Sequence, residues 1–314
     1  MRLVRFLRRD KVGWGLDAGE VVVDGRKAAE ALDLVPYSEM KDVIEDGEAG
    51  LSVIRRIQQT AQDESNFRDG FSYPRESCGF LSPLPNPNKL LCLAGNYRMH
   101  IKEAGLRASE HSGRMTPQVF MKPPSTTIIG PFDPILIQQD SVAVDWELEL
   151  AVVVGKRGKY ITPERAMDYV FGYTIMNDVS ERRMNSGFVD RFKREFDPFF
   201  DWLNGKWFDS FAPLGPAIVT SDDVDDARQL SIRLTVNGEL MQNSNTKHMI
   251  FNIPETIAYI SSFMTLEPGD IIATGTPEGV GMSRNLFLKP GDKVCGEIEQ
   301  IGRIENIVQR EATS

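Results

Sequence analysis

The chain has 314 residues, with 36 Lys and Arg against 45 Asp and Glu, which gives a formal net charge of −9. Hydrophobic residues make up 41% and charged residues 26%, values typical of a globular protein and not of a disordered or fibrous one. The chain is acidic overall, whereas nucleic-acid-binding proteins usually carry an excess of Lys and Arg. No apolar run reaches the roughly 18 residues that would span a bilayer. We therefore expect neither nucleic acid nor a membrane among its partners.

The three cysteines, Cys78, Cys92 and Cys295, are far apart and form no C-x-x-C pair. This pattern indicates neither a disulfide framework nor a cysteine zinc site. We interpret them as reduced thiols, which favours a cytoplasmic location. The first ten residues are basic but lack the apolar core of a secretory signal, so we predict that they begin the first strand.

The N-terminal part is predicted to form a small α+β domain that ends in a proline-rich connector. Strand-like apolar runs occupy residues 2–6 and 20–23, and apolar residues recur at helical spacing over residues 51–61. Three prolines at alternating positions then follow, and they favour an extended connector. We place the boundary there, so that residues 1–85 form the first domain and residues 86–314 the second.

The second domain is predicted to be mostly β, because short apolar runs alternate with Gly and Pro. We expect strands at residues 90–93, 119–121, 135–137, 147–154, 170–176, 232–236 and 293–298, and helices at residues 99–106, 163–167 and 254–263. The Asn237-Gly238 pair predicts a hairpin turn. No Walker or Rossmann glycine pattern follows a strand, which disfavours a nucleotide cofactor.

Two acidic residues, Glu147 and Glu149, lie in one predicted strand and therefore point to the same face, about 6–7 Å apart along the strand. The strand continues into an apolar run that looks buried, where unpaired carboxylates are costly. A third carboxylate, Asp178, ends another apolar strand. A hard divalent cation would relieve their repulsion. The alternative is a half-exposed strand that carries solvated acids.

His100 and Glu103 are three residues apart on a predicted helix, where side chains at this spacing are neighbours. The carboxylate can orient the imidazole and raise its basicity, as in a general base that acts on water. The alternative is an exposed helix pair with no role. The chain has only three histidines, so an oxygen-ligand site for Mg²⁺, Mn²⁺ or Ca²⁺ is favoured over a zinc cluster.

A glycine-rich loop follows the predicted strand that starts at Ile271, and its residues 274–281 have the sequence TGTPEGVG. Backbone N–H groups and a Thr hydroxyl in such a loop can approach an anionic ligand closely. A Gly- and Pro-rich turn without a ligand explains the loop equally well. It lacks the lysine of a phosphate-binding P-loop.

In this order the motifs resemble the fumarylacetoacetate hydrolase family over residues 90–308. The motifs are Asn96-Tyr97, His100 with Glu103, Phe120-x-Lys122-Pro123, Glu147-x-Glu149, Asp178 with Arg182, Lys206, and the TGTPEGVG loop. One departure is Asn185, a shorter amide at a position that is often Gln in the family. The resemblance implies an α+β, mostly β fold, in which a mixed β-sheet roll or barrel forms the catalytic domain and a small α+β domain precedes it.

The resemblance also implies roles for individual residues. By similarity, Glu147, Glu149 and Asp178 hold one Mg²⁺ or Mn²⁺ per subunit, with Ca²⁺ as a further option. His100, Glu103 and Lys206 are expected to be catalytic, and Tyr97, Arg182, Asn185 and Thr276 to bind substrate. For Arg182 the alternative is an ion pair with Glu181 or Asp178, and for Lys206 it is a position in a surface turn.

The activity implied by the resemblance is metal-dependent hydrolysis of a C–C bond between two carbonyls of an acylpyruvate or related 2,4-dioxo acid, in catabolism of aromatic compounds or sugar acids. The alternative is decarboxylation of oxaloacetate or isomerisation of an enol diacid at the same site. A non-catalytic binding protein is a third reading. The expected partners are a small anionic dioxo acid and a second copy in a homodimer. The aromatic residues of segment 188–208 are interpreted as packing, with a substrate pocket or dimer interface as alternatives.

Overall fold

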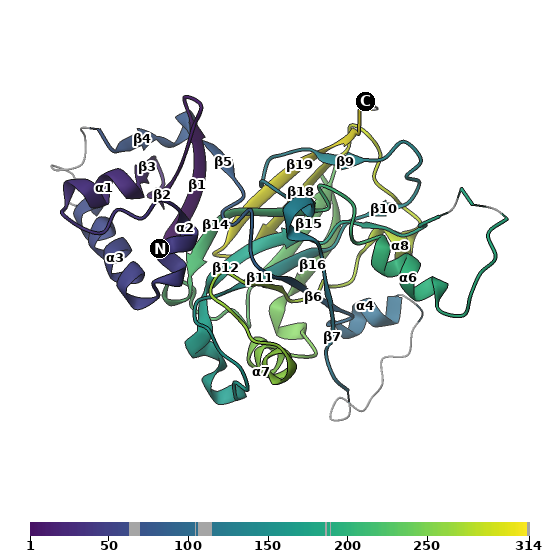
Figure 1. Cartoon of the computed structure of the whole chain (residues 1–314). Helices are drawn as coiled ribbons and strands as arrows, with labels where there is room; N and C mark the ends of the chain where they lie inside the picture. Colours follow the sequence, from purple (N-terminus) through teal and green to yellow (C-terminus); the bar gives the residue numbers. More distant parts are fainter. Residues whose placement is uncertain (63–69, 104, 106–114, 186, 189, 313–314) are drawn as a thin grey trace.

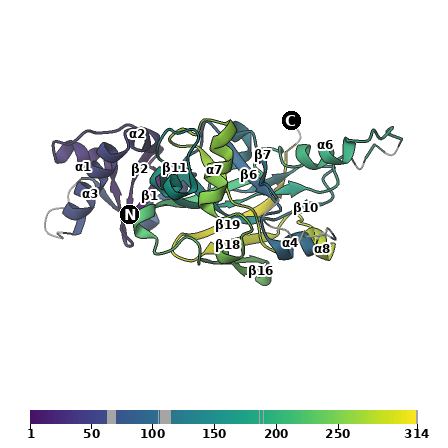
Figure 2. The ribbon, with the colours of Figure 1, turned by 90° about the horizontal axis from the view of Figure 1, so that it is seen from below.

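Two β-sheets form the centre of the molecule, with helices at both ends and on the faces (Figure 1, Figure 2). The computed structural model describes residues 1–62, 70–103, 105, 115–185, 187–188 and 190–312. The strands are β1 (Arg2–Arg8), β2 (Lys11–Asp17), β3 (Val21–Asp24), β4 (Ser72–Pro74), β5 (Gly79–Leu81), β6 (Leu90–Ala94), β7 (Gln118–Met121), β8 (Ile128–Ile129), β9 (Ile135–Ile137), β10 (Val144–Asp145), β11 (Leu148–Val154), β12 (Val170–Asn177), β13 (Ser180–Glu181), β14 (Ala212–Thr220), β15 (Ser231–Val236), β16 (Glu239–Asn245), β17 (Ile271–Ala273), β18 (Lys293–Ile298) and β19 (Gly302–Arg310). The helices are α1 (Gly25–Ala31), α2 (Met40–Glu45), α3 (Glu48–Gln62), α4 (Arg98–Glu103), α5 (Pro124–Thr127), α6 (Asp197–Asn204), α7 (Ile253–Phe263) and α8 (Gly281–Arg284), and the 3₁₀ helices are η1 (Arg75–Ser77), η3 (Pro163–Tyr169), η4 (Ser221–Asp223) and η5 (Thr246–His248).

The larger sheet has 12 strands, and its main path runs β4-β3-β2-β1-β14-β12-β11-β17-β6-β7. The smaller sheet has five strands in the order β16-β15-β18-β19-β9. Most neighbouring strands are antiparallel, but three pairs are parallel: β17 with β6, β19 with β9 and β14 with β8. The mostly β, mixed-sheet fold class is therefore confirmed, and the pairing of the described strands closes no barrel.

Strand β11 separates two hydrophobic cores, and this explains why all its residues are buried. Leu148, Leu150 and Val152 pack into one cluster, whereas Ala151 and Val153 pack into the other. Side chains alternate along a strand, so the two faces of β11 serve different cores. Glu149 therefore points to the second face, together with Ala151 and Val153.

The N-terminal unit continues the same sheet rather than forming a sheet of its own. Strand β1 pairs antiparallel with β14, with Leu3 opposite Ile218. Helices α1, α2 and α3 cover this end of the molecule, where the chain starts (Figure 1). Trp14 and Ile54 pack into the same cluster as Leu90 and Cys92 of β6. The division into residues 1–85 and 86–314 remains a prediction, and one shared sheet crosses it.

Most of the predicted elements are present with small differences at their ends. The strands over residues 135–137 and 293–298 have the predicted bounds, and the Asn237-Gly238 hairpin joins β15 to β16. The predicted helix 99–106 is described only as α4, because Ala104 and residues 106–114 lie outside the described residues. Among the longer strands, β2, β14, β16 and β19 were not predicted, and the predicted helix 163–167 is the 3₁₀ helix η3.

The interpretation of the aromatic segment 188–208 as packing is wrong for much of it. The side chains of Phe188, Phe192 and Phe196 are 67%, 86% and 66% exposed. Only the end of the segment packs inward, where Trp202 lies edge-on to Phe120 with ring centroids 5.1 Å apart. Helix α6 and this segment project from one end of the molecule (Figure 2).

Cys78, Cys92 and Cys295 are all free, so none of them forms a disulfide. Among the described helices, none combines the length and apolar character that crossing a membrane requires.

Candidate active site

Three carboxylates converge where β11 begins and β12 ends. Leu148 lies opposite Asn177 in the antiparallel pair, which sets Glu147 beside Asp178, and the Asp178 N–H donates to the Glu147 carbonyl at 2.8 Å. Glu147, Glu149 and Asp178 each offer an oxygen within 4.8 Å of the others. They are 5%, 0% and 0% exposed, so the alternative of solvated acids on a half-exposed strand is wrong.

Two buried lysines lie against these carboxylates. The Lys206 ammonium donates to Glu147 Oε2 and to Asp178 Oδ2, both at 2.6 Å. The Lys122 ammonium donates to Asp178 Oδ1 at 2.6 Å and to the Val179 carbonyl at 2.9 Å. Lys206 follows helix α6 and is 2% exposed, so it does not belong to a surface turn.

The electrostatics of this cluster are set by burial and by the paired charges. Burial raises the pKa of Glu147, but Arg182 and then Lys206 outweigh it and hold this pKa well below the usual range. Burial lowers the pKa of Lys206, yet Asp178 and Glu147 raise it overall. For Lys122 burial prevails and its pKa is lowered.

Glu149 is the carboxylate without a cationic partner. Its Oε2 accepts from the Gly275 N–H at 2.7 Å, while its Oε1 is buried and has no hydrogen-bond partner among the described residues. Burial, then Asp178 and Glu147, raise its pKa well above the usual value. A buried oxygen without a partner destabilises the folded protein unless a positive group reaches it. The three carboxylates therefore fit a hard divalent cation such as Mg²⁺ or Mn²⁺.

Arg182 is held by two carboxylates. Its Nε donates to Asp145 Oδ2 at 2.8 Å, and its Nη2 pairs with Glu147. Asp145 also accepts from the N–H groups of Gly281 and Met282, at 2.6 and 3.0 Å. Arg182 is therefore in an ion pair, as the alternative stated, but its partners are Asp145 and Glu147 and not Glu181 or Asp178. Its contact with substrate remains a prediction.

The predicted imidazole–carboxylate pair is formed on helix α4. His100 Nδ1 lies 2.9 Å from Glu103 Oε1. The other oxygen of Glu103 accepts from the Gly279 N–H at 2.9 Å, which joins the helix to the glycine-rich loop. Burial raises the pKa of Glu103, but the His100 and Gly279 hydrogen bonds lower it overall. Glu103 is therefore a fixed anion that orients the imidazole.

The remaining predicted residues lie in different surroundings. The Thr276 hydroxyl donates to the Leu148 carbonyl at 3.0 Å and accepts from Gln242 at 2.9 Å, so it anchors the loop to β11. The Tyr97 hydroxyl is buried and has no partner among the described residues. Asn185 donates to Asp201 of helix α6 at 2.9 Å. No described contact brings it to the carboxylates.

Sequence reasoning missed three residues as members of the site. Lys122 carried a signal, because it lies in the Phe-x-Lys-Pro motif. Asp145 carried another, since it shares the alternation of Glu147 and Glu149. Gln242 lies in no sequence pattern that indicated a role in the site. It comes from the smaller sheet, accepts from the Leu148 N–H at 3.0 Å and donates to the Pro277 carbonyl at 2.9 Å.

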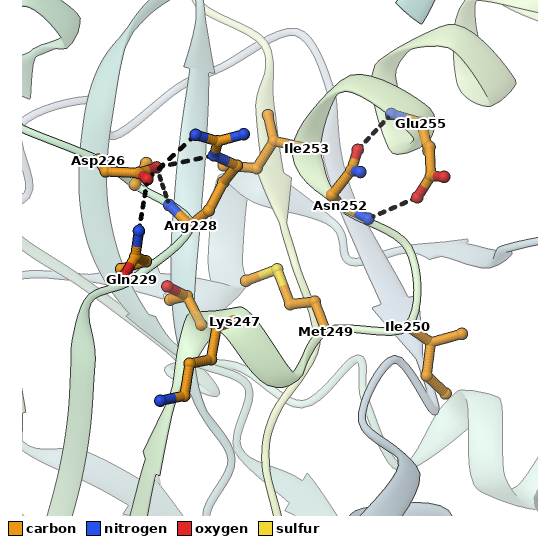
Figure 3. Close-up of a pocket in the computed structure, with 11 residues that line it drawn as sticks. Asp226, Arg228, Gln229, Lys247, Met249, Ile250, Asn252, Ile253 and Glu255 are labelled. Carbon is orange, nitrogen blue, oxygen red and sulfur yellow. Dashed lines mark hydrogen bonds and ion pairs between the residues drawn. The ribbon is translucent and has the colours of Figure 1, made fainter.

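A cavity of about 540 Å³ is lined in part by Met249, which forms a β-bridge with Tyr97 (Figure 3). Three of its charged side chains, Asp226, Arg228 and Glu255, hydrogen-bond within the lining. Arg228 donates to both oxygens of Asp226, at 2.8 and 3.1 Å, and Asn252 caps helix α7 reciprocally with Glu255. Nothing in this lining calls for a ligand.

Comparison with known proteins identifies close relatives over nearly the whole chain. An oxaloacetate tautomerase of Bos taurus, named as mitochondrial, is 43% identical over 314 residues, covering 98% of this chain and 91% of its own length. An oxaloacetate tautomerase of Homo sapiens, also named as mitochondrial, is 41% identical over 312 residues, with the same coverage. Both relatives are named as mitochondrial proteins. The cytoplasmic location that we expected from the cysteines is therefore wrong.

Solved structures match the whole fold. The maleylpyruvate hydrolase of Sphingobium sp. SYK-6, solved in complex with manganese(II) ion and pyruvate, has a TM-score of 0.75 and 30% identity, with 99% of this chain and 100% of that chain covered. The fumarylacetoacetate hydrolase of Exiguobacterium antarcticum has a TM-score of 0.76 with the same identity and coverage. The family described as fumarylacetoacetate (FAA) hydrolase C-terminal matches residues 89–309. The chain therefore belongs to the fumarylacetoacetate hydrolase family.

Proposed function

We propose that the protein is a metal-dependent tautomerase that interconverts the keto and enol forms of oxaloacetate or a closely related 2-oxo dicarboxylate. The observation that carries this proposal is the similarity of 98% of the chain to oxaloacetate tautomerases at 41–43% identity. The buried triad of Glu147, Glu149 and Asp178 supports it. The mitochondrial location named for these relatives is carried over as part of the proposal.

In this proposal Glu147, Glu149 and Asp178 hold the cation, while Lys122 and Lys206 hold the carboxylates in place. A bound Mg²⁺ or Mn²⁺ would polarise the 2-oxo group and offset the negative charge that develops on its oxygen. Each lysine ammonium has three N–H donors, and the described contacts use two of them. In this proposal the third donor of Lys206 binds a substrate oxygen, whereas the Lys122 side chain is completely buried and stays with Asp178.

His100 is the proton carrier of the proposed reaction. Glu103 holds Nδ1 of the ring, so Nε2 is the nitrogen that takes a proton from the carbon next to the carbonyl and returns it in the reverse direction. The net charge of −9 repels a dicarboxylate at long range, and screening limits this repulsion to about 8–10 Å at ordinary salt. Attraction is therefore local, through the lysines and the bound cation.

The experiment that tests this proposal follows the decay of enol-oxaloacetate by its ultraviolet absorbance, with Mg²⁺, with Mn²⁺ and after chelation. We expect acceleration that depends on the cation. A protein that accelerates the decay equally after chelation, or not at all, would refute the proposal.

A second candidate function is hydrolysis of acylpyruvates. The His100–Glu103 pair favours it, because an oriented imidazole can deprotonate water, and the similarity to a maleylpyruvate hydrolase supports it. His100→Ala separates these two base-dependent reactions from decarboxylation of oxaloacetate. We expect the variant to lose tautomerisation and hydrolysis but to retain decarboxylation of oxaloacetate, since loss of CO₂ requires no base. Wild-type turnover of oxaloacetate without turnover of acylpyruvates favours the first candidate.

We also propose that the protein forms a homodimer through the exposed aromatic segment. Phe188, Phe192 and Phe196 expose large apolar surfaces that a second copy would cover. Sedimentation of the wild type and of a Phe192→Ser, Phe196→Ser variant tests this assignment. A monomeric wild type, or a variant that remains dimeric, would contradict it.

A further inference from the structure

Asp145 of strand β10 is a completely buried carboxylate that lies outside the triad. Its Oδ1 accepts from the N–H groups of Trp146 and Gly281, at 2.8 and 2.6 Å. Its Oδ2 accepts from the Met282 N–H at 3.0 Å and from Arg182 Nε at 2.8 Å. A carboxylate has about four lone-pair sites, so these donors use the acceptor capacity of Asp145. Asp145 therefore acts on its protein neighbours and not on a ligand of its own.

The backbone also brings Arg182 to this strand. Strand β10 pairs antiparallel with β13, with Asp145 opposite Ser180. The Arg182 N–H donates to the Ala143 carbonyl at 2.9 Å, which continues this pairing beyond the end of β13. Arg182 is thus held beside Asp145 through its backbone as well as through its side chain.

One end of the Arg182 guanidinium remains unpaired. Its Nε donates to Asp145, and its Nη2 pairs with Glu147 of the triad. Its Nη1 has no hydrogen-bond partner among the described residues. Since Nη1 is bonded to the same carbon as Nη2, it lies beside the carboxylate triad. There it can donate two charge-assisted hydrogen bonds to an anion.

Asp145 also holds the end of the TGTPEGVG loop. Helix α8 begins at Gly281, and its N-cap residue Val280 provides no side-chain cap, so Asp145 accepts from the first N–H groups of the helix. The approach is close, because a Cβ added at Gly281 would lie 2.8 Å from Asp145 Oδ1. The same loop holds Glu103 through a backbone N–H at 2.9 Å. One buried carboxylate therefore joins Arg182 to the loop that fixes the imidazole–carboxylate pair.

We propose that Asp145 is a positioning residue, which orients the Arg182 guanidinium so that Nη1 binds a carboxylate of the substrate. The inference rests on the proposed function, in which the substrate is a 2-oxo dicarboxylate. Asp145 holds Nε and Glu147 holds Nη2, so two contacts fix the guanidinium plane before the anion arrives. The carboxylate that Arg182 binds does not react, so the contact is equally strong in the ground state and in the transition state. Its loss should therefore raise KM and leave kcat nearly unchanged.

Asp145→Asn tests this role with little change in shape. An amide has one acceptor oxygen where the carboxylate has two, so two of the four donors lose their acceptor in either orientation of the side chain. In both orientations Arg182 loses the negative charge next to its Nε. The alternative is that Asp145 only caps helix α8, in which case its effect does not depend on Arg182.

The experiment compares ketonisation of enol-oxaloacetate by the Mn²⁺-loaded full-length wild type, by Asp145→Asn, by Arg182→Gln and by the double variant. A positioning group displaced by about 1 Å can cost about 10²-fold, so we expect Asp145→Asn to raise KM at least about tenfold and to change kcat less than about threefold. Because Asp145 acts through Arg182, the double variant should have the KM of Arg182→Gln. Asp168→Asn is the matched control, since Asp168 pairs with Arg165 at 3.4 Å and both side chains are exposed. It should leave KM and kcat unchanged.

The Kd for Mn²⁺ shows whether each variant is folded with an intact triad. Glu147 keeps its contact with Lys206 in Asp145→Asn, so the Kd should stay close to that of the wild type. If Asp145→Asn does not fold, Arg182→Lys takes its place. Lysine keeps the charge but lacks the planar fork that Asp145 orients, so KM should again rise at least about tenfold.

An active wild type whose KM is unchanged in Asp145→Asn, or in Arg182→Lys, overturns the inference. A KM increase that multiplies in the double variant also overturns it, because a cap of helix α8 that acts independently of Arg182 would give this result. So does a loss confined to kcat. A wild type without activity on the enol refutes the proposed function itself, whatever the variants do.

Discussion

Replacement of Glu149 by glutamine should stabilise the metal-free protein and abolish its response to metal. Glu149 is completely buried, and its Oε1 has no partner among the described residues. Its folded pKa is raised, so its ionisation destabilises the fold at every pH above the unfolded pKa of about 4.3. Glutamine carries no charge, and its carbonyl can still accept from the Gly275 N–H. The substitution therefore removes the charge and puts an NH₂ donor in place of the unpaired Oε1, next to the oxygens of Glu147 and Asp178.

The magnitude follows from the cost of such a group. An unsatisfied buried polar group costs about 1–3 kcal/mol, which we expect Glu149→Gln to recover in metal-free buffer at neutral pH. At roughly 2 °C per kcal/mol for a chain of this size, Tm rises by about 2–6 °C. Metal at 100 times its Kd adds about 2.7 kcal/mol to the wild type, but only about 0.4 kcal/mol to a variant whose affinity is 100-fold weaker.

Thermal unfolding of the wild type and of Glu149→Gln, each with chelator and with Mn²⁺, gives the four Tm values that the test requires. The order of Tm in chelator should be variant above wild type, and the metal-induced rise should be confined to the wild type. A variant less stable than the wild type in chelator, with an undiminished rise in Mn²⁺, would refute the reasoning about Glu149. Glu239→Gln serves as the control for loss of a surface charge.

Three further predictions concern the loop, the pH dependence and the thiols. Gly279→Ala should cost about 1–3 kcal/mol more in chemical denaturation than Gly238→Ala, because both glycines have positive φ but only at Gly279 would the new Cβ meet a backbone oxygen, at 2.1 Å. The folded pKa of Glu147 is lowered, since Arg182 and Lys206 outweigh burial, so its contribution to stability is complete above the unfolded pKa of about 4.3 and is lost as pH falls below it. Denaturation midpoints of the wild type from pH 7 down to about 3 should therefore decline, and a flat profile would contradict the pairing. Cys92 is fully buried and burial raises its pKa, so a thiol reagent should label Cys92 only after denaturation.

The carboxylate cluster was largely predictable because it depends on local rules. Alternation along a strand sets Glu147 and Glu149 on one face, and the end of an apolar strand marks Asp178. Alternation alone does not say which strands are neighbours. The pairing of β11 with β12, with Leu148 opposite Asn177, is what brings Asp178 to Glu147.

The lysine of the site and the contact from the smaller sheet were less predictable, because the residues that they join are far apart in the sequence. Lys206 reaches Asp178 across 28 residues of chain, and Gln242 reaches Leu148 across 94. Strand β14 contains two prolines and a glycine in a buried run, a composition that argues against a central strand. It nevertheless lies between β1 and β12, where its residues Leu214 and Ile218 pack into the second core.

The aromatic segment shows why hydrophobic composition does not identify burial. Phenylalanine is usually buried in a hydrophobic core, yet Phe192 and Phe199 are 86% and 55% exposed. Their neighbours explain this arrangement. Arg191 pairs with Asp201 at 2.8 Å and with Asp197 at 3.3 Å, so ion pairs join this part of the segment to helix α6.

The most direct test of the central claim is the initial rate of enol-oxaloacetate decay at a fixed protein concentration, measured on metal-stripped protein, after addition of Mg²⁺ or Mn²⁺, and for Glu149→Gln under the same conditions. We predict a rate near the uncatalysed value without metal, acceleration when metal is added to the wild type, and none when it is added to the variant. Equal rates for stripped and metal-loaded wild type, or full activity of Glu149→Gln, would contradict the account.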